Sequence, residues 1–288
     1  MATRKQKRRQ LKKKVLTSFR WGSLGLFAWL TTLSIVIGAT VGASPVHATS
    51  VKKMVIIIDD LGNGMKGTDE MLNMPIKLNV AIMPFLPTTK RDAELAHQKG
   101  IDVLVHMPME PRKGKKDWLG PGAITTDLSD AEIRKRVNAA IDDVPYAIAM
   151  NNHMGSKVTS DRRIMSIVLD VCKERGLFFV DSKTDPNSVV AELAAVKRLP
   201  PVENDIFLDD QYSISHISRQ MRRAEEKLQQ QDICVTIGHV GVPGLMTAGI
   251  IRDAIPRLTG KVELISISDM VKQVWNWYPD PTIPTNNK

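Results

Sequence analysis

The sequence has few cysteines and lacks the motifs of several enzyme classes. Only Cys172 and Cys234 occur in 288 residues, and they do not form a Cys-x-x-Cys pair. Two cysteines do not make a disulfide-built scaffold, so they are either small buried side chains or a single bridge. The sequence also lacks a clear phosphate-binding glycine loop and an active-site cluster of Arg and Lys, which disfavours a hydrolase acting on phosphoesters.

An excess of positive charge is absent outside the first 20 residues. Residues 1–20 carry nine of the 40 Lys and Arg residues and no acid, and the remaining 31 basic residues balance the 31 acidic ones. The formal charge of +9 therefore gives no support for nucleic-acid binding by the folded part of the chain, and we expect no nucleic-acid partner.

An uncharged stretch from Trp21 to Ala43 follows the basic head. This order is typical of a signal peptide or of a single membrane span with its basic end inside. Small residues at 46 and 48 fit cleavage before Thr49, whereas the length of the stretch fits an uncleaved anchor. We expect residues 1–48 to be a signal or anchor, and the protein to be exported to the periplasm or cell surface, with membrane contact through this segment if it is uncleaved.

From residue 54 onward, short apolar segments alternate with amphipathic ones. The expected strands are 54–60, 78–84, 102–109, 147–153, 178–182, 205–209, 233–238 and 262–267. The expected helices lie near 65–73, 88–99, 129–143, 161–174, 188–197, 214–231 and 245–257. Seven or eight such units in about 215 residues predict a parallel (β/α) barrel over residues 49–273, followed by a C-terminal tail over 274–288.

The apolar run Val55-Ile56-Ile57-Ile58 ends in two adjacent acids, Asp59 and Asp60. An unbroken apolar run is typical of a strand covered on both faces. Adjacent buried carboxylates are costly unless a cation, a proton or hydrogen bonds satisfy them, although Asp is also a common helix cap and turn residue. Because chemistry gathers at the carboxyl ends of barrel strands, this pair predicts a functional site.

Polar groups also stand at the ends of other predicted strands. They are His106 with Glu110, Asn152 with His153, Asp181, Asp209 and His239. In a closed barrel all these ends surround one mouth. Two imidazoles and one carboxylate suit a metal of zinc type, which lowers the pKa of a bound water to about 7. A second carboxylate would accept the proton of that water, and a histidine on the opposite side would protonate a leaving group. The set therefore indicates metal-assisted hydrolysis of an ester or amide.

Each of these residues has a structural alternative. The three histidines would also fit as hydrogen-bonded side chains at the barrel rim, and Asp181 and Asp209 would fit as helix caps. Glu110 precedes a proline and either positions a ligand or belongs to a turn. The long connection at 110–128 either shapes a substrate groove or is a surface loop.

Taken together, the motifs resemble those of the divergent polysaccharide deacetylases, a distant branch of the NodB-type carbohydrate esterases. The resemblance covers roughly residues 52–273, and its segments are IIIDDLG at 56–62, HMPMEP at 106–111, NNHMGS at 151–156, FLDD at 207–210 and IGH at 237–239. It implies a distorted (β/α) barrel of about seven strands that removes acetyl groups from N- or O-acetylated sugars.

The resemblance also implies roles. Asp59 matches the general base, Asp60 a metal ligand and His239 the general acid. The usual second motif supplies both metal-binding histidines as His-x-x-x-His, but the second of these positions is Glu110 here, so the second histidine would be His153 from the next strand. The arginine-bearing third motif has no clear counterpart. The metal ligands are thus expected to be Asp60, His106 and His153, and the substrate contacts Glu110, Asn152, Asp181 and Asp209.

We therefore expect an exported, metal-dependent deacetylase that uses zinc and acts on acetylated polysaccharide or peptidoglycan. The departures from the usual motifs leave an alternative of another class, which is a non-catalytic envelope protein that binds glycan or acts as a scaffold on the same fold.

Overall fold

The computed structural model describes residues 51–115 and 118–283, so the predicted segment 1–48 lies outside it. The strands are β1 (Lys52–Leu61), β2 (Asn79–Ile82), β3 (Asp102–Met109), β4 (Ala147–Met154), β5 (Phe178–Asp181), β6 (Val202–Glu203), β7 (Ile206–Phe207), β8 (Ile233–His239) and β9 (Val262–Leu264). The helices are α1 (Thr68–Leu72), α2 (Thr89–Gln98), α3 (Asp130–Asp143), α4 (Arg162–Glu174), α5 (Val190–Val196), α6 (Ile214–Lys227), α7 (Gly244–Leu258) and α8 (Ile267–Trp275). None of these helices has the length and apolarity needed to cross a membrane.

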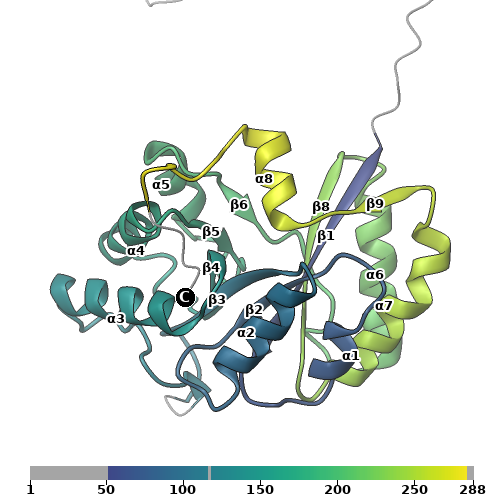
Figure 1. Cartoon of the computed structure of the whole chain (residues 1–288), viewed down its shortest axis with the longest axis horizontal. Coiled ribbons are helices and arrows are strands. Elements are labelled where there is room, and N and C mark those ends of the chain that lie inside the picture. The colour runs from purple at the N-terminus through teal and green to yellow at the C-terminus, as the bar shows by residue number, and fades with distance from the viewer. Residues whose placement is uncertain (1–50, 116–117, 284–288) are drawn as a thin grey trace, which may run out of the picture. The chain divides into compact units, whose positions relative to one another are not determined.

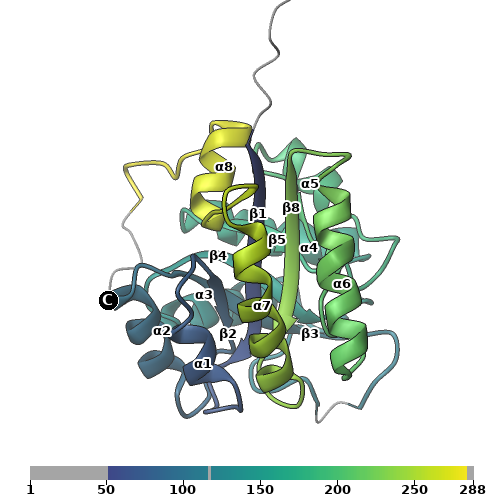
Figure 2. The same cartoon turned by 90° about the vertical axis from the view of Figure 1, so that its right-hand side faces the viewer.

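All strand pairs are parallel, as the alternation of strands and helices predicts. The strand order is β6-β5-β4-β3-β2-β1-β8-β7, and β9 pairs with the amino end of β1. Helices cover the outside of this curled sheet, with α6 and α7 beside β8 (Figures 1 and 2). The result is the distorted (β/α) barrel expected from the sequence.

Successive side chains of each strand point alternately to the helices and to the barrel interior. On β1, Ile56 and Ile58 belong to the large core between sheet and helices, whereas Val55 and Ile57 belong to a smaller core inside the barrel. The smaller core occupies the amino-terminal part of the interior. The inward positions beyond it, toward the carboxyl ends of the strands, carry polar residues.

Helix α8 covers the amino-terminal end of the barrel and was not predicted. Figure 1 shows α8 lying over this end of the barrel. Met270 and Val271 of α8 are part of the interior core, and Trp277 packs edge-on against Phe178, with ring centroids 5.3 Å apart. The strand expected over 262–267 therefore ends at Leu264. A local signal was present, because Ser266 caps α8 by accepting a hydrogen bond from the Asp269 amide.

The hydrogen-bonded sheet is interrupted at one place among the described residues. Strand β6 pairs with β5, β7 pairs with β8, and β6 and β7 do not pair with each other. The two residues between them bond to different strands. The Asn204 amide donates to Asp181 O of β5, and the Asp205 amide donates to Val235 O of β8. We call this interruption the β6–β7 seam.

Candidate metal centre and active site

The barrel interior is polar at the carboxyl ends of the strands, because the inward-facing residues of each strand change there from apolar to polar. On β1, Asp59 continues the series of Val55 and Ile57. On β8, His239 likewise continues the series of Val235 and Ile237. On β3 and β4 the continuing residues are His106, Asn151 and His153. The alternation that builds the apolar core therefore also places these polar side chains in one layer.

Asp60 reaches the same layer through a break in the alternation. The register between β1 and β2 shifts between Ile58 and Leu61, and Asp60 has a left-handed backbone with φ of 70°. A β-bulge of this kind redirects a side chain that would otherwise face the helices. Asp and Asn tolerate the left-handed conformation better than most residues. As a result, the side chains of the adjacent residues Asp59 and Asp60 both face the barrel interior.

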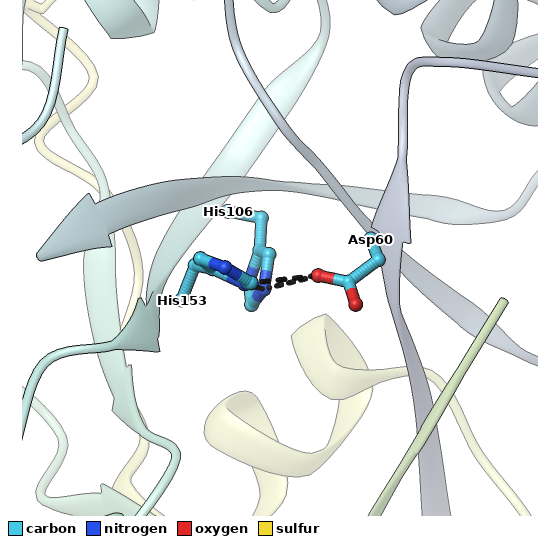
Figure 3. A group of neighbouring side chains, drawn as sticks. All are labelled: Asp60, His106 and His153. Carbon is cyan, nitrogen blue, oxygen red and sulfur yellow. Dashed lines mark hydrogen bonds and ion pairs between the residues drawn. The ribbon is translucent and has the colours of Figure 1, made fainter. Parts of the chain in front are cut away.

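Asp60, His106 and His153 bring three potential ligand atoms together (Figure 3). Asp60 Oδ1 lies 3.2 Å from His106 Nε2 and 3.0 Å from His153 Nδ1, and the two nitrogens are 3.1 Å apart. Zinc bonds of about 2.0–2.1 Å to nitrogen and oxygen ligands separate such atoms by roughly 3.0–3.4 Å. The three atoms thus have the spacing of ligands on one cation.

In each imidazole, one ring nitrogen bonds to an oxygen outside the group, and the other ring nitrogen turns its lone pair toward this point. His106 Nδ1 lies 2.7 Å from Asn151 Oδ1, and His153 Nε2 lies 3.2 Å from the Trp118 carbonyl oxygen. Each of these ring nitrogens donates its proton to an oxygen, so His106 Nε2 and His153 Nδ1 keep their lone pairs. Asp60 Oδ1 is buried and has no hydrogen-bond donor among the described residues. A carboxylate oxygen and two imidazole lone pairs that face one another need a positive charge between them, and the donor set fits a divalent metal ion of zinc type.

Burial and neighbouring charges act in opposite directions on the ionisable groups around this point. Burial alone would raise the pKa of Asp60, but His106 and His153, when their rings are protonated and donate to it, hold that pKa well below its ordinary value. Burial lowers the pKa of His106, yet the carboxylates of Asp59 and Asp60 raise it above its usual value. Burial raises the pKa of Asp59, against the lowering effect of His106 and His239.

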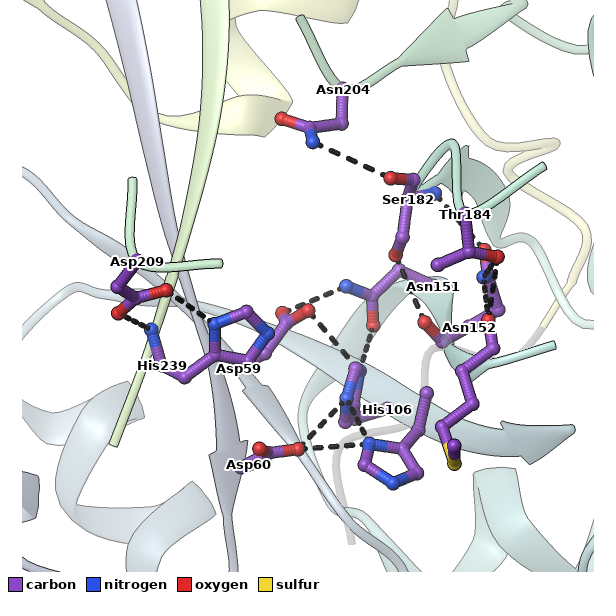
Figure 4. A network of polar contacts seen from close by, with 12 residues as sticks. Asp59, Asp60, His106, Asn151, Asn152, Ser182, Thr184, Asn204, Asp209 and His239 are labelled. Atoms are coloured by element: carbon purple, nitrogen blue, oxygen red, sulfur yellow. Dashed lines mark hydrogen bonds and ion pairs between the residues drawn. The ribbon is translucent and has the colours of Figure 1, made fainter. Parts of the chain in front are cut away.

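His239 stands on the other side of Asp59 and is held by Asp209. His239 Nδ1 lies 2.6 Å from Asp209 Oδ1, while Asp209 Oδ2 accepts from the His239 amide and from Thr247 Oγ1 (Figure 4). Burial lowers the pKa of His239, but the bond to Asp209 outweighs it and raises the pKa to about 9. His239 is therefore protonated at neutral pH, and Nε2 is the ring nitrogen that Asp209 does not use.

These groups line one pocket of about 640 Å³. Asp59, Asp60, His106, Asn152, His153, Asp209 and His239 all belong to its wall. Asn152, predicted to contact substrate, also holds the turn after β4, because its Nδ2 donates to Met154 O and its Oδ1 accepts from the Ser182 amide. Both carboxylate oxygens of Asp209, another predicted substrate contact, are engaged by His239 and Thr247 as described above.

Glu110 and Asp181, the other two predicted substrate contacts, do not line this pocket. Glu110 accepts hydrogen bonds from the amide and hydroxyl of Thr126 and forms an ion pair with Lys157 at 2.7 Å. Asp181 follows the outward series of β5 and accepts from the Lys183 amide, and burial raises its pKa. Strand alternation could have separated Asp181 from the interior residues, and it could have indicated Asn151, to which no role was assigned from the sequence.

Comparison with known families gives a match that covers most of the chain. The model of a family described as "Divergent polysaccharide deacetylase" matches residues 56–271. An uncharacterized protein of Haemophilus influenzae is 31% identical over 232 residues, which cover 81% of this chain and 79% of that protein.

Two solved structures share the fold. An uncharacterized protein from Agrobacterium tumefaciens superposes with a TM-score of 0.70 at 17% identity, over 79% of this chain and 92% of that one. The Xyl-CE4 domain of a xylanase from the hindgut metagenome of Trinervitermes trinervoides gives 0.51 at 11% identity, over 80% of this chain and 93% of that one. At these identities the likeness concerns the fold alone.

Proposed function

Because this chain belongs to the divergent polysaccharide deacetylase family, we propose that it is a metal-dependent deacetylase that hydrolyses acetyl groups from amino sugars of a polysaccharide such as peptidoglycan. The observation that carries the proposal is the convergence of Asp60, His106 and His153 on one point of a pocket that Asp59 and His239 also line. This arrangement supports the proposal because it would bring a metal site, a base and an acid into one cavity.

The roles of the side chains follow from their charge and partners. A divalent metal ion held by Asp60, His106 and His153 would polarise the acetyl carbonyl and lower the pKa of the attacking water. Asp59 accepts one proton of that water as its oxygen bonds to the carbonyl carbon. His239, protonated and held by Asp209, donates a proton to the sugar nitrogen as the carbon–nitrogen bond breaks. The products are acetate and a free amine.

Export is also part of the proposal, and it rests on the sequence of residues 1–48. The nine basic residues followed by the uncharged stretch to Ala43 support passage across a membrane. An acetylated envelope polymer would then be the accessible substrate, with zinc as the metal that suits the ligand set.

The test is acetate release by the purified protein from chitooligosaccharides, acetylated xylan and peptidoglycan. We expect release that a zinc chelator abolishes and that added zinc restores. Release that persists with the chelator would contradict metal dependence. Glycan binding without any acetate release would instead favour a non-catalytic role. One observation supports that role: Glu110 occupies the second position of the usual His-x-x-x-His spacing.

We expect the rate of acetate release to fall as the pH rises through about 9, because His239 must be protonated to act as an acid and its pKa is about 9. The Asp209→Asn variant loses the anion that raises this pKa, so its rate should begin to fall at a lower pH. Rate profiles of both proteins between pH 6 and 10 measure the shift. An unchanged alkaline limb in the variant would show that His239 is not the acid.

A further inference from the structure

Asn151 lies between the proposed base, Asp59, and a proposed metal ligand, His106. Its side-chain NH₂ group and its side-chain oxygen each bond to one of them. It is fully buried in the middle of β4. Its Nδ2 donates to Asp59 Oδ1 at 2.8 Å, and its Oδ1 lies 2.7 Å from His106 Nδ1 (Figure 4). One uncharged side chain therefore links two groups that come from β1 and β3.

The amide can face only one way in this position. The Asp59 carboxylate only accepts hydrogen bonds, so the NH₂ group of Asn151 must face Asp59 and the amide oxygen must face His106. His106 Nδ1 then has to carry the ring proton, and Nε2 presents its lone pair toward Asp60 and His153. The acceptor oxygen of Asp59 thus selects, through the orientation of one amide, the imidazole tautomer that would bind a metal ion.

The same amide also restrains Asp59. The second oxygen of Asp59 lies 3.6 Å from His106 Nδ1, beyond ordinary hydrogen-bond distance, so Asn151 provides the close side-chain bond to this carboxylate. A neutral donor orients the carboxylate without the full neutralisation that a guanidinium or ammonium group would bring. Its neighbour Asn152 bonds instead to Met154 and Ser182, so the two adjacent asparagines have separate roles.

We propose that Asn151 is a positioning residue that sets the metal-binding tautomer of His106 and the orientation of the base Asp59 together. This inference rests on the proposed metal-dependent function. It adds a residue outside the proposed metal ligands and the acid–base pair.

Three variants of the full chain separate the two tasks. Asn151→Leu removes both bonds at similar volume. Asn151→Asp keeps an acceptor for His106 Nδ1 but replaces the donor to Asp59 with a like charge. The control is Asn79→Leu, because Asn79 is also a fully buried strand asparagine whose side chain makes two backbone hydrogen bonds, to Ile56 O and from the Ile267 amide. The readouts are zinc affinity by competition with a chelating dye, the His106 tautomer by long-range ¹H–¹⁵N NMR, and acetate release.

We expect Asn151→Leu to weaken zinc binding by about 10–100-fold and to shift His106 away from the Nδ1–H tautomer. Asn151→Asp should keep that tautomer and bind zinc more tightly than Asn151→Leu, yet lose most acetate release. Asn79→Leu should lower stability and leave the tautomer and zinc affinity unchanged.

The outcomes distinguish this inference from the proposed function. If the wild type binds zinc and releases acetate while Asn151→Leu matches Asn79→Leu, the inference is wrong and the function stands. If the wild type neither binds zinc nor releases acetate, the proposed function fails. The inference is still decided in that case, by the His106 tautomer measured in the wild type and in Asn151→Asp. A wild-type His106 that carries its proton on Nε2 overturns it, even if Asn151→Leu does not fold.

Discussion

Asp59→Asn is expected to lower the rate of acetate release by about 10²–10⁴-fold and to leave zinc affinity nearly unchanged. The variant retains an oxygen that accepts from Asn151 Nδ2, so the neighbouring bond survives. What it loses is the carboxylate that takes the proton of water. Because the proposed ligand oxygen belongs to Asp60, and Asp59 is not part of the three-residue group, activity and metal binding should separate in this variant.

The matched control for this experiment is Asp102→Asn. Asp102 begins β3, at the opposite end of the strand from the site, and its carboxylate accepts from the Ser268 amide. This variant should lose some stability at the start of α8 and keep its activity. If Asp59→Asn and Asp102→Asn are equally active, Asp59 is not the base.

His153→Ala is expected to remove stoichiometric zinc binding and to reduce acetate release to the background. The substitution leaves Asp60 and His106 as a two-ligand site, and the buried oxygen of Asp60 loses one of its two close imidazoles. A three-ligand site with open positions for water and substrate is the usual requirement of catalytic zinc. Metal analysis of the purified variant and the acetate assay measure the two losses.

Two further variants decide where the second imidazole comes from. His97→Ala removes an exposed histidine that stacks on Tyr146, and it should keep both zinc and activity. Glu110→Ala alters the second position of the usual His-x-x-x-His spacing, and it should keep zinc because Glu110 bonds to Thr126 and Lys157. Loss of zinc in Glu110→Ala, with zinc retained in His153→Ala, would contradict the ligand set.

The strands near the site could be predicted because their sequences admit few alternatives. The apolar run ending at Ile58 fits a strand buried on both faces, and the parallel barrel then places its end beside the ends of β3 and β4. That reasoning is sufficient to expect Asp60, His106 and His153 near one another. It needs only strand ends and barrel topology, and no detail of side-chain packing.

The features that were missed depend on tertiary contacts or on single positions. Helix α8 is stabilised by the barrel interior it covers, through Met270 and Val271, and not by its sequence alone. Strand β6 has two residues, which is too short for a pattern. The outward direction of Asp181 follows from counting alternate positions along its strand. The inward turn of Asp60 follows from a bulge that no alternation rule predicts.

The β6–β7 seam has a consequence for the width of the barrel beside the pocket. A fully paired barrel has its circumference fixed by strand number and stagger, so its mouth has one diameter. Here β6 and β7 share no ladder bond and are joined by the chain through Asn204 and Asp205, whose amides bond to different neighbours. Phe207 and Asp209, just beyond the seam, belong to the pocket wall. The width of the barrel beside the pocket is therefore set here by a short stretch of covalent chain, and not by the strand pairing that fixes the rest of the circumference.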